Sequence, residues 1–167
     1  ELHLIFDIMK KLAFCLMAAA ALLAGCSKDN GNETAIDYYN GSSFLGTMTV
    51  TYQSTDYKTD NVQVDMSINE ATDGSNTTSM TLVMKQIKFV PQMPVVLDIT
   101  IPGLTTKSGT DGTTTITGNN IIPLAMGGQY PLYKITNFSG TLDTNGVLSY
   151  SMTVGSYPVT YKGTIKK

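Results

Sequence analysis

From residue 44 onward the side chains of this chain alternate between apolar and polar, and no window keeps apolar residues at helical spacing. Successive side chains of an extended strand point to opposite faces, so alternation indicates strands that bury one face. The pattern therefore predicts an all-β domain over residues 44–167. The eight apolar runs begin at Phe44, Val62, Met80, Val95, Ile116, Ile135, Leu148 and Tyr157.

Two of these runs change face by one residue partway along. The first change falls at Lys85 and Gln86, so that Ile87 and Phe89 are expected to point inward, and the second falls at Asn137. One extra residue within a strand produces a β-bulge. We therefore predict a bulge at each of these two places.

Turn-forming residues separate the runs. Asp-Gly and Asn-Gly dipeptides favour tight turns between antiparallel strands, and proline marks other corners. Short runs at even spacing predict an antiparallel meander closed into an eight-stranded barrel, or alternatively a β-sandwich. The turn signals are Asp73-Gly74, Asp111-Gly112, Asn145-Gly146, Pro91, Pro94 and Pro102-Gly103.

A repeated motif favours the barrel. An aromatic residue, any residue, glycine, threonine and an aliphatic residue follow one another at 44–48, 138–142 and 161–165. Glycine allows the sharp coiling that closes a small barrel, and a nearby aromatic ring covers the gap it leaves. We expect residues 44–53 to pair antiparallel with residues 157–166, because closure removes both exposed edges.

Three segments carry a family resemblance. Residues 44–50 (FLGTMTV) open the predicted barrel, Met93-Pro94-Val95 begins its fourth strand, and residues 161–165 (YKGTI) close it. In these segments the chain resembles the calycin-like β-barrel lipoproteins and secreted proteins of Bacteroides and related bacteria. The resemblance implies a lipocalin-like barrel over most of residues 41–167, and it brings no activity and no catalytic residues.

The N-terminal segment reads as a lipoprotein signal. Lys10 and Lys11 supply positive charge, residues 12–24 (LAFCLMAAAALLA) are uncharged, and Gly25 precedes Cys26. This order is typical of a signal that is cleaved before a cysteine that receives lipid. The alternative is a plain signal peptide that contains a cysteine.

This interpretation divides the chain into three parts. We expect residues 1–25 to be an upstream extension plus the signal, with Met9 as the natural start. Residues 26–43 are polar and are expected to form a flexible lipidated tether, followed by the barrel of residues 44–167. The expected location is the outer membrane, on its cell-surface or periplasmic face, because residues 27–30 resemble the export signal of surface lipoproteins in the Bacteroidetes.

The composition argues against most chemistry. His3 and Cys15 lie in the expected leader, and the chain has no arginine. Nucleophilic triads, thiol catalysis, and zinc or copper sites rely on histidine or cysteine. A net charge of −2 without arginine also argues against nucleic-acid binding. We therefore expect no enzyme activity, no cofactor and no metal.

Four aspartates are the remaining candidates for chemistry. Asp65 and Asp98 lie within predicted strands, where a pair could hydrolyse glycosides, but both alternate with apolar neighbours and are expected to face solvent. Asp73 and Asp111 could contact calcium, yet each sits in an Asp-Gly turn without further acidic ligands. The turn role alone explains them.

The expected barrel interior is rich in methionine and tyrosine. Such side chains suit a variable apolar ligand, although they can equally fill the core. Three functional classes remain open. The first is a lipid-anchored barrel that binds a small apolar molecule or glycan fragment, and the second is a structural or protein-interaction lipoprotein of the envelope with a filled core. The third is an enzyme, which a buried carboxylate pair would support. The candidate ligand-facing residues are Met48, Tyr52, Met66, Met80, Met84, Tyr150, Met152 and Tyr161.

Overall fold

The computed structural model describes residues 35–69, 78–89 and 93–166. The expected signal, Cys26, Asp73 and Pro91 lie outside these residues. The described chain is built almost entirely of strands. In order, the elements are α2 (Ala35–Tyr38), β1 (Ser43–Tyr52), β2 (Thr55–Asn69), β3 (Ser79–Ile87), β4 (Leu97–Ser108), β5 (Thr114–Gly118), β6 (Leu124–Ala125), β7 (Gly128–Gln129), the 3₁₀ helix η1 (Pro131–Tyr133), β8 (Ile135–Leu142), β9 (Val147–Val154) and β10 (Tyr157–Ile165).

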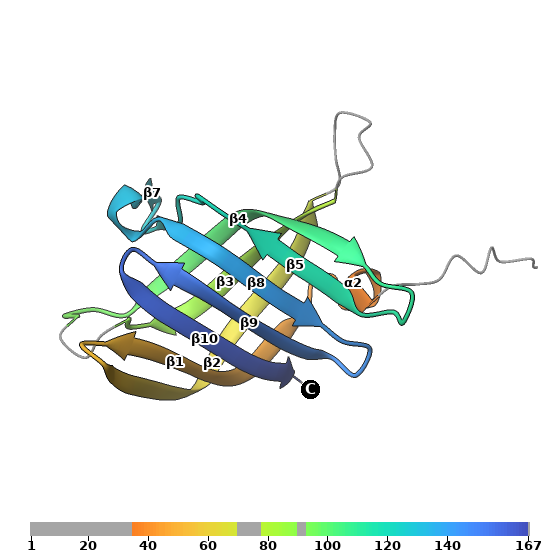
Figure 1. The fold of residues 1–167 in the computed structure, drawn as a ribbon, viewed down its shortest axis with the longest axis horizontal. Coiled ribbons are helices and arrows are strands. Elements are labelled where there is room, and N and C mark those ends of the chain that lie inside the picture. Colours follow the sequence, from red (N-terminus) through yellow and green to blue (C-terminus); the bar gives the residue numbers. More distant parts are fainter. Residues whose placement is uncertain (1–34, 70–77, 90–92, 167) are drawn as a thin grey trace, which may run out of the picture. The chain divides into compact units, whose positions relative to one another are not determined.

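The strands form an antiparallel meander that closes on itself (Figure 1). Strands β1 to β5 follow one another around the wall, β8, β9 and β10 continue it, and β10 pairs with β1. The short β6–β7 hairpin joins this wall only where Leu124 pairs with Thr100 of β4. The predicted closed eight-stranded barrel is therefore confirmed, and the β-sandwich alternative is not adopted.

The closing seam has the predicted partners. The register of β1 against β10 runs from Phe44 opposite Ile165 to Val50 opposite Val159, which places Gly46 directly opposite Gly163. A Cβ added to Gly46 would collide with the main chain of residues 162 and 163. Gly46 is therefore required by the close approach of two backbones, whereas a Cβ on Gly163 would first meet the Tyr161 side chain.

Both predicted bulges are confirmed. Gln86 and Asn137 adopt positive φ of 49° and 53°, and the strand registers shift beside them. Ile87 and Phe89 are buried, as expected from the change of face. Two other expectations were wrong in detail. Pro102-Gly103 makes no corner, because it lies within β4 where the register against β3 shifts, and Val95 is 51% exposed because it precedes β4 instead of belonging to its inner face.

Strand β2 is longer than the alternation indicated. It begins at Thr55, whereas the apolar run begins at Val62, because residues 55–61 are almost all exposed and carry polar side chains. The turn before it contains no glycine. Gln53 and Ser54 both adopt positive φ there, which is the geometry of a tight two-residue hairpin.

The barrel interior is filled. The buried core runs through all eight wall strands and contains five methionines, with the aromatic rings of Phe138, Tyr150 and Tyr161 stacked at centroid distances of 5.0 and 5.1 Å. The Tyr161 hydroxyl lies over Gly163 and donates a hydrogen bond of 3.2 Å to the Val62 carbonyl. Side chains of this size leave the interior of an eight-stranded barrel closely packed.

A short helix closes one end of the barrel. The core includes Ala35 and Ile36 of α2 and Tyr39, which follows the helix. Residues 26–43 were expected to form a flexible tether. The Ala35 amide donates to the Gly112 carbonyl at 3.2 Å, and the Tyr39 hydroxyl donates to the Thr144 carbonyl at 3.1 Å. These bonds fasten α2 to the β4–β5 and β8–β9 turns, at the right of Figure 1.

Replacing Ile36 by alanine tests whether this segment belongs to the fold. We expect the free energy of unfolding to fall by about 2–4 kcal/mol, as for other buried isoleucines. Urea denaturation measures the change, and Tyr38→Ala is the matched control because Tyr38 is 68% exposed on the same helix. Equal, small effects of both variants would show that α2 does not contribute to the core.

Candidate functional site

The barrel end opposite α2, called the mouth here, carries the most distinctive surface. The β1–β2 and β9–β10 turns, the β3–β4 connection and the long segment between β5 and β8 all meet there. The β6–β7 hairpin and η1 belong to that long segment, at the left of Figure 1. These connections, and not the barrel interior, therefore shape the accessible hollows at this end.

A small apolar cavity, the mouth pocket, lies beneath the β6–β7 hairpin. Its volume is about 130 Å³, and no charged residue is among those that line it. Phe89 stacks on Tyr133 at 6.2 Å between ring centroids, and the Phe89 amide donates to the Met93 sulfur at 3.1 Å, so both walls are held in place. The lining residues are Phe89, Met93, Leu97, Ile99, Pro123, Leu124, Ala125, Tyr130 and Tyr133.

Four exposed apolar side chains lie within two residues along the chain of residues that line this pocket. Val95 and Val96 are each 51% exposed, Met126 is 80% exposed and Leu132 is 89% exposed. We call these four residues the apolar rim. A second hollow of about 480 Å³ contacts Val95, Val96 and Met126 and shares Leu97 with the mouth pocket. The rim thus extends the apolar surface from the pocket into solvent.

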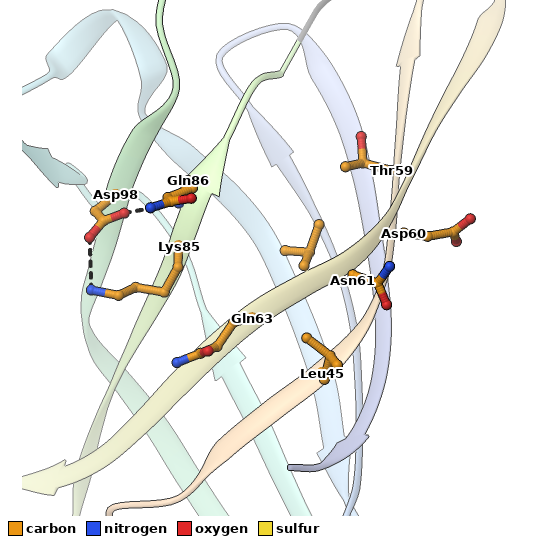
Figure 2. A pocket seen from close by; sticks show the side chains of 9 residues that line it. Leu45, Thr59, Asp60, Asn61, Gln63, Lys85, Gln86 and Asp98 are labelled. Atoms are coloured by element: carbon orange, nitrogen blue, oxygen red, sulfur yellow. Dashed lines mark hydrogen bonds and ion pairs between the residues drawn. The ribbon is translucent and has the colours of Figure 1, made fainter.

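A polar groove of about 380 Å³ opens between β2 and β3 (Figure 2). The two strands pair only from Val64 opposite Met84 onward, and before that point they diverge. Lys85 donates to Asp98 at 2.7 Å, and the Gln86 amide donates to the same carboxylate at 2.9 Å. The Lys85 hydrogen bond lowers the pKa of Asp98 and raises the pKa of Lys85.

The two strand carboxylates form parts of surface networks. Asp98 is exposed as expected, whereas Asp65 is half-buried and accepts hydrogen bonds from Ser43 at 2.6 Å and Gln63 at 2.7 Å. Each carboxylate is therefore held by its own donors. The donors around Asp98 stabilise its ionised form and lower its pKa, which is unlike the raised pKa of a general acid.

The eight residues expected to face a ligand lie away from the mouth pocket. All but Tyr52 are buried in the core, and Tyr52 is half-buried at the mouth beside Tyr157, 5.7 Å between ring centroids. Among the described residues, none of the eight lines the mouth pocket. Burial raises the pKa of both Tyr150 and Tyr161, and the Tyr150 hydroxyl has no hydrogen-bond partner in the described part of the chain.

The expected turn role of Asp111 is visible. Its carboxylate accepts the Thr113 amide at 3.0 Å, and Gly112 adopts a φ of 80°. Within residues 35–69, 78–89 and 93–166, no three acidic, histidine or cysteine residues group closely enough to hold a metal ion. Over the same ranges, no helix has the length and apolar character needed to cross a membrane.

The sequence patterns missed the mouth pocket because one of its walls lies outside the alternating runs. Pro123, Ala125, Tyr130 and Tyr133 all fall between β5 and β8, where glycine and proline interrupt the alternation. One signal was present in the sequence. Apolar residues are frequent in segment 119–134 although they do not alternate, which is unusual for a surface connection.

No protein-family model, curated protein or solved structure matches this chain. The resemblance to calycin-like lipoproteins therefore stays a prediction, and the argument for function depends on the geometry of the mouth.

Proposed function

We propose that this protein is a non-catalytic binding protein of the bacterial envelope that takes a small uncharged apolar group into the mouth pocket. The observation that carries the proposal is the pairing of an apolar cavity with an apolar rim. Ligand pockets are mostly apolar with a few polar groups that fix orientation. Here Tyr130 and Tyr133 supply aromatic faces together with hydroxyl groups.

The size of the cavity limits the group it can hold. An engineered apolar cavity of about 150 Å³ accommodates benzene, so about 130 Å³ suits one aromatic ring or a short branched alkyl chain. The remainder of a larger ligand would lie along Val95, Val96 and Met126. The filled core supports this location over the barrel interior, where the methionine side chains already pack against one another.

The anchor completes the proposal. Lipid on Cys26 would attach the chain to the membrane, and residues 27–34 connect that cysteine to α2. Attachment of this kind would keep the binding domain at the envelope, where apolar molecules of the surrounding medium could reach it.

Toluene titration followed by methyl NMR tests the pocket. We expect saturable shifts of the Met93, Leu97 and Ile99 methyl groups, because these side chains line the pocket. The core methyl groups of Met48 and Met66 serve as the internal control and are expected to stay in place. Shifts confined to the core methyls would place the ligand in the interior and contradict the proposal.

Filling the cavity provides the matched variant. Ala125→Leu adds apolar volume inside the pocket and is expected to abolish the toluene shifts. Met126→Ala removes a rim side chain outside the pocket and is expected to leave toluene binding intact. Unchanged toluene binding by Ala125→Leu would show that the shifts arise from another site.

A second candidate function is supported by the rim. Met126 is 80% exposed and Leu132 is 89% exposed, and large apolar side chains exposed near one another mark protein interfaces. On that alternative the mouth docks onto another envelope protein. Cross-linking in the host through a photoreactive residue at position 126, lost in Leu132→Ser but unaffected by Ala125→Leu, would favour docking over ligand binding.

A further inference from the structure

One strand of the barrel wall keeps an open edge. Strand β1 pairs with β2 down to Tyr52 opposite Thr55, whereas β3 pairs with β2 only from Val64 to Asn69. Among the described residues, 55–59 therefore have no neighbouring strand on the side away from β1. We call these residues the open edge, and it ends where Asn61 adopts a φ of 59° and the register shifts.

The open edge is chemically symmetric about its middle residue. Its sequence is Thr55-Asp56-Tyr57-Lys58-Thr59. If two copies lie antiparallel with Tyr57 opposite Tyr57, Asp56 faces Lys58 and Thr55 faces Thr59, each twice because of the two-fold axis. Aromatic pairs, threonine pairs and opposite charges are the favourable cross-strand pairs.

Neighbouring registers are less favourable. A pairing centred on Lys58 places two lysines opposite each other and sets Asp56 against Asp60. Like charges directly opposite destabilise a sheet, so the sequence specifies the register centred on Tyr57. Charged residues on an edge normally discourage association, but in this one register the charges of a second copy are complementary.

The side chains needed for this pairing are available. Asp56, Lys58 and both threonines are exposed, and Lys58 has no charged partner within the described residues. Asp56 accepts one hydrogen bond of 2.7 Å from Thr51 of β1, which leaves its second oxygen for the lysine of another copy. Tyr57 is half-buried and lies 6.4 Å from Tyr52 between ring centroids.

We propose that two copies of this chain pair antiparallel through their open edges, with the two-fold axis at Tyr57, so that two barrel walls continue into one sheet. The backbone groups of residues 55–59 supply the hydrogen bonds, and the Asp56–Lys58 pairs set the register. Because the edge is short, the dimer is concentration-dependent, as expected of interfaces below about 1,000 Å².

Charge reversal on either side of Tyr57 tests the pairing. In Lys58→Asp the two copies oppose aspartates, and in Asp56→Lys they oppose lysines, so each variant alone is expected to sediment as a single chain. An equal mixture of the two restores every opposite-charge pair and is expected to form the dimer. Two misfolded variants could not restore dimer formation when they are mixed. All of these proteins keep residues 1–34, so any association through that part is common to all of them.

Sedimentation equilibrium of the full chain across a concentration series measures the masses. Wild type is expected to dimerise, with a dissociation constant at least about tenfold lower than that of either single variant. Lys162→Asp on β10 makes the same charge change at an exposed site away from the edge and is expected to behave as wild type. A wild type that stays a single chain throughout, or a mixture no more associated than its components, would overturn the proposal.

Discussion

Gly46→Val is expected to destabilise the barrel by about 3 kcal/mol or more, because overpacking at this position meets backbone atoms that cannot move aside. An added Cβ collides with the Lys162 carbonyl and with the Cα of Gly163 on the opposite strand. Relief requires β1 and β10 to separate at the seam that closes the wall. The free energy of unfolding in urea measures the effect.

Gly128→Val is the matched control. Gly128 also lies in a strand, and its φ is not in the left-handed region. A Cβ there meets only the Ala125 carbonyl, at 3.9 Å. Its effect is expected to stay within about 0.5 kcal/mol, as for most surface substitutions. Hydrogen exchange of the amides of residues 160–165 locates the damage, since opening of the seam removes their protection. Equal stability of the two valine variants would refute the argument for close approach.

The closing seam could be predicted because two independent signals agreed. Apolar alternation gave the inner face of β1 and β10, and the repeated motif placed Gly46 and Gly163 in both strands. The bulges at Gln86 and Asn137 were visible for a related reason. When a strand buries one side, a β-bulge is one of the few geometries that allow the buried side chains to change face by one residue.

The first half of β2 could not be predicted from alternation. Residues 55–59 pair with β1 but bury little, so no apolar period marks them as a strand. The α2 segment was missed for a different reason. Its few apolar residues lie within a polar stretch, and their burial depends on contacts with turns far along the chain, such as the bond from Tyr39 to Thr144.

The candidate binding site was only partly predictable. Alternation correctly placed Met48, Met66 and Tyr150 inside the barrel, but it could not tell a filled interior from a hollow one. That distinction depends on how side chains of particular volumes interdigitate. Part of the mouth pocket is formed by connections with irregular turns, including the β6–β7 hairpin. The alternation of apolar and polar residues does not predict the geometry of such turns.

The two stacked tyrosines of the core make the fold sensitive to alkali. Burial raises the pKa of Tyr150 and of Tyr161 above the ordinary value of 10.0. Below about pH 10 both phenols are protonated in the folded and unfolded states, so their contribution to stability is complete. Above that pH the unfolded chain loses the protons while the folded chain retains them, and stability falls as pH rises.

The expected slope is large. Each phenol that stays protonated only in the folded state lowers the free energy of unfolding by about 1.4 kcal/mol per pH unit, and two such phenols double that slope. A slope of this size becomes comparable with the whole stability of a small domain within a few pH units. We therefore expect cooperative unfolding in alkaline solution, measured by circular dichroism alongside the phenolate absorbance.

Phenylalanine variants separate the two groups. Tyr150→Phe removes a buried hydroxyl that has no partner among the described residues, so stability at pH 7 is expected to stay level or rise while the alkaline slope halves. Tyr161→Phe also halves the slope, but it removes the hydrogen bond to the Val62 carbonyl and is expected to cost about 1–3 kcal/mol at pH 7. The double variant is expected to resist unfolding to higher pH, whereas Tyr38→Phe, at an exposed ring, leaves the slope unchanged. An alkaline transition that stays at the wild-type pH in the double variant would show that other groups, and not the core tyrosines, control it.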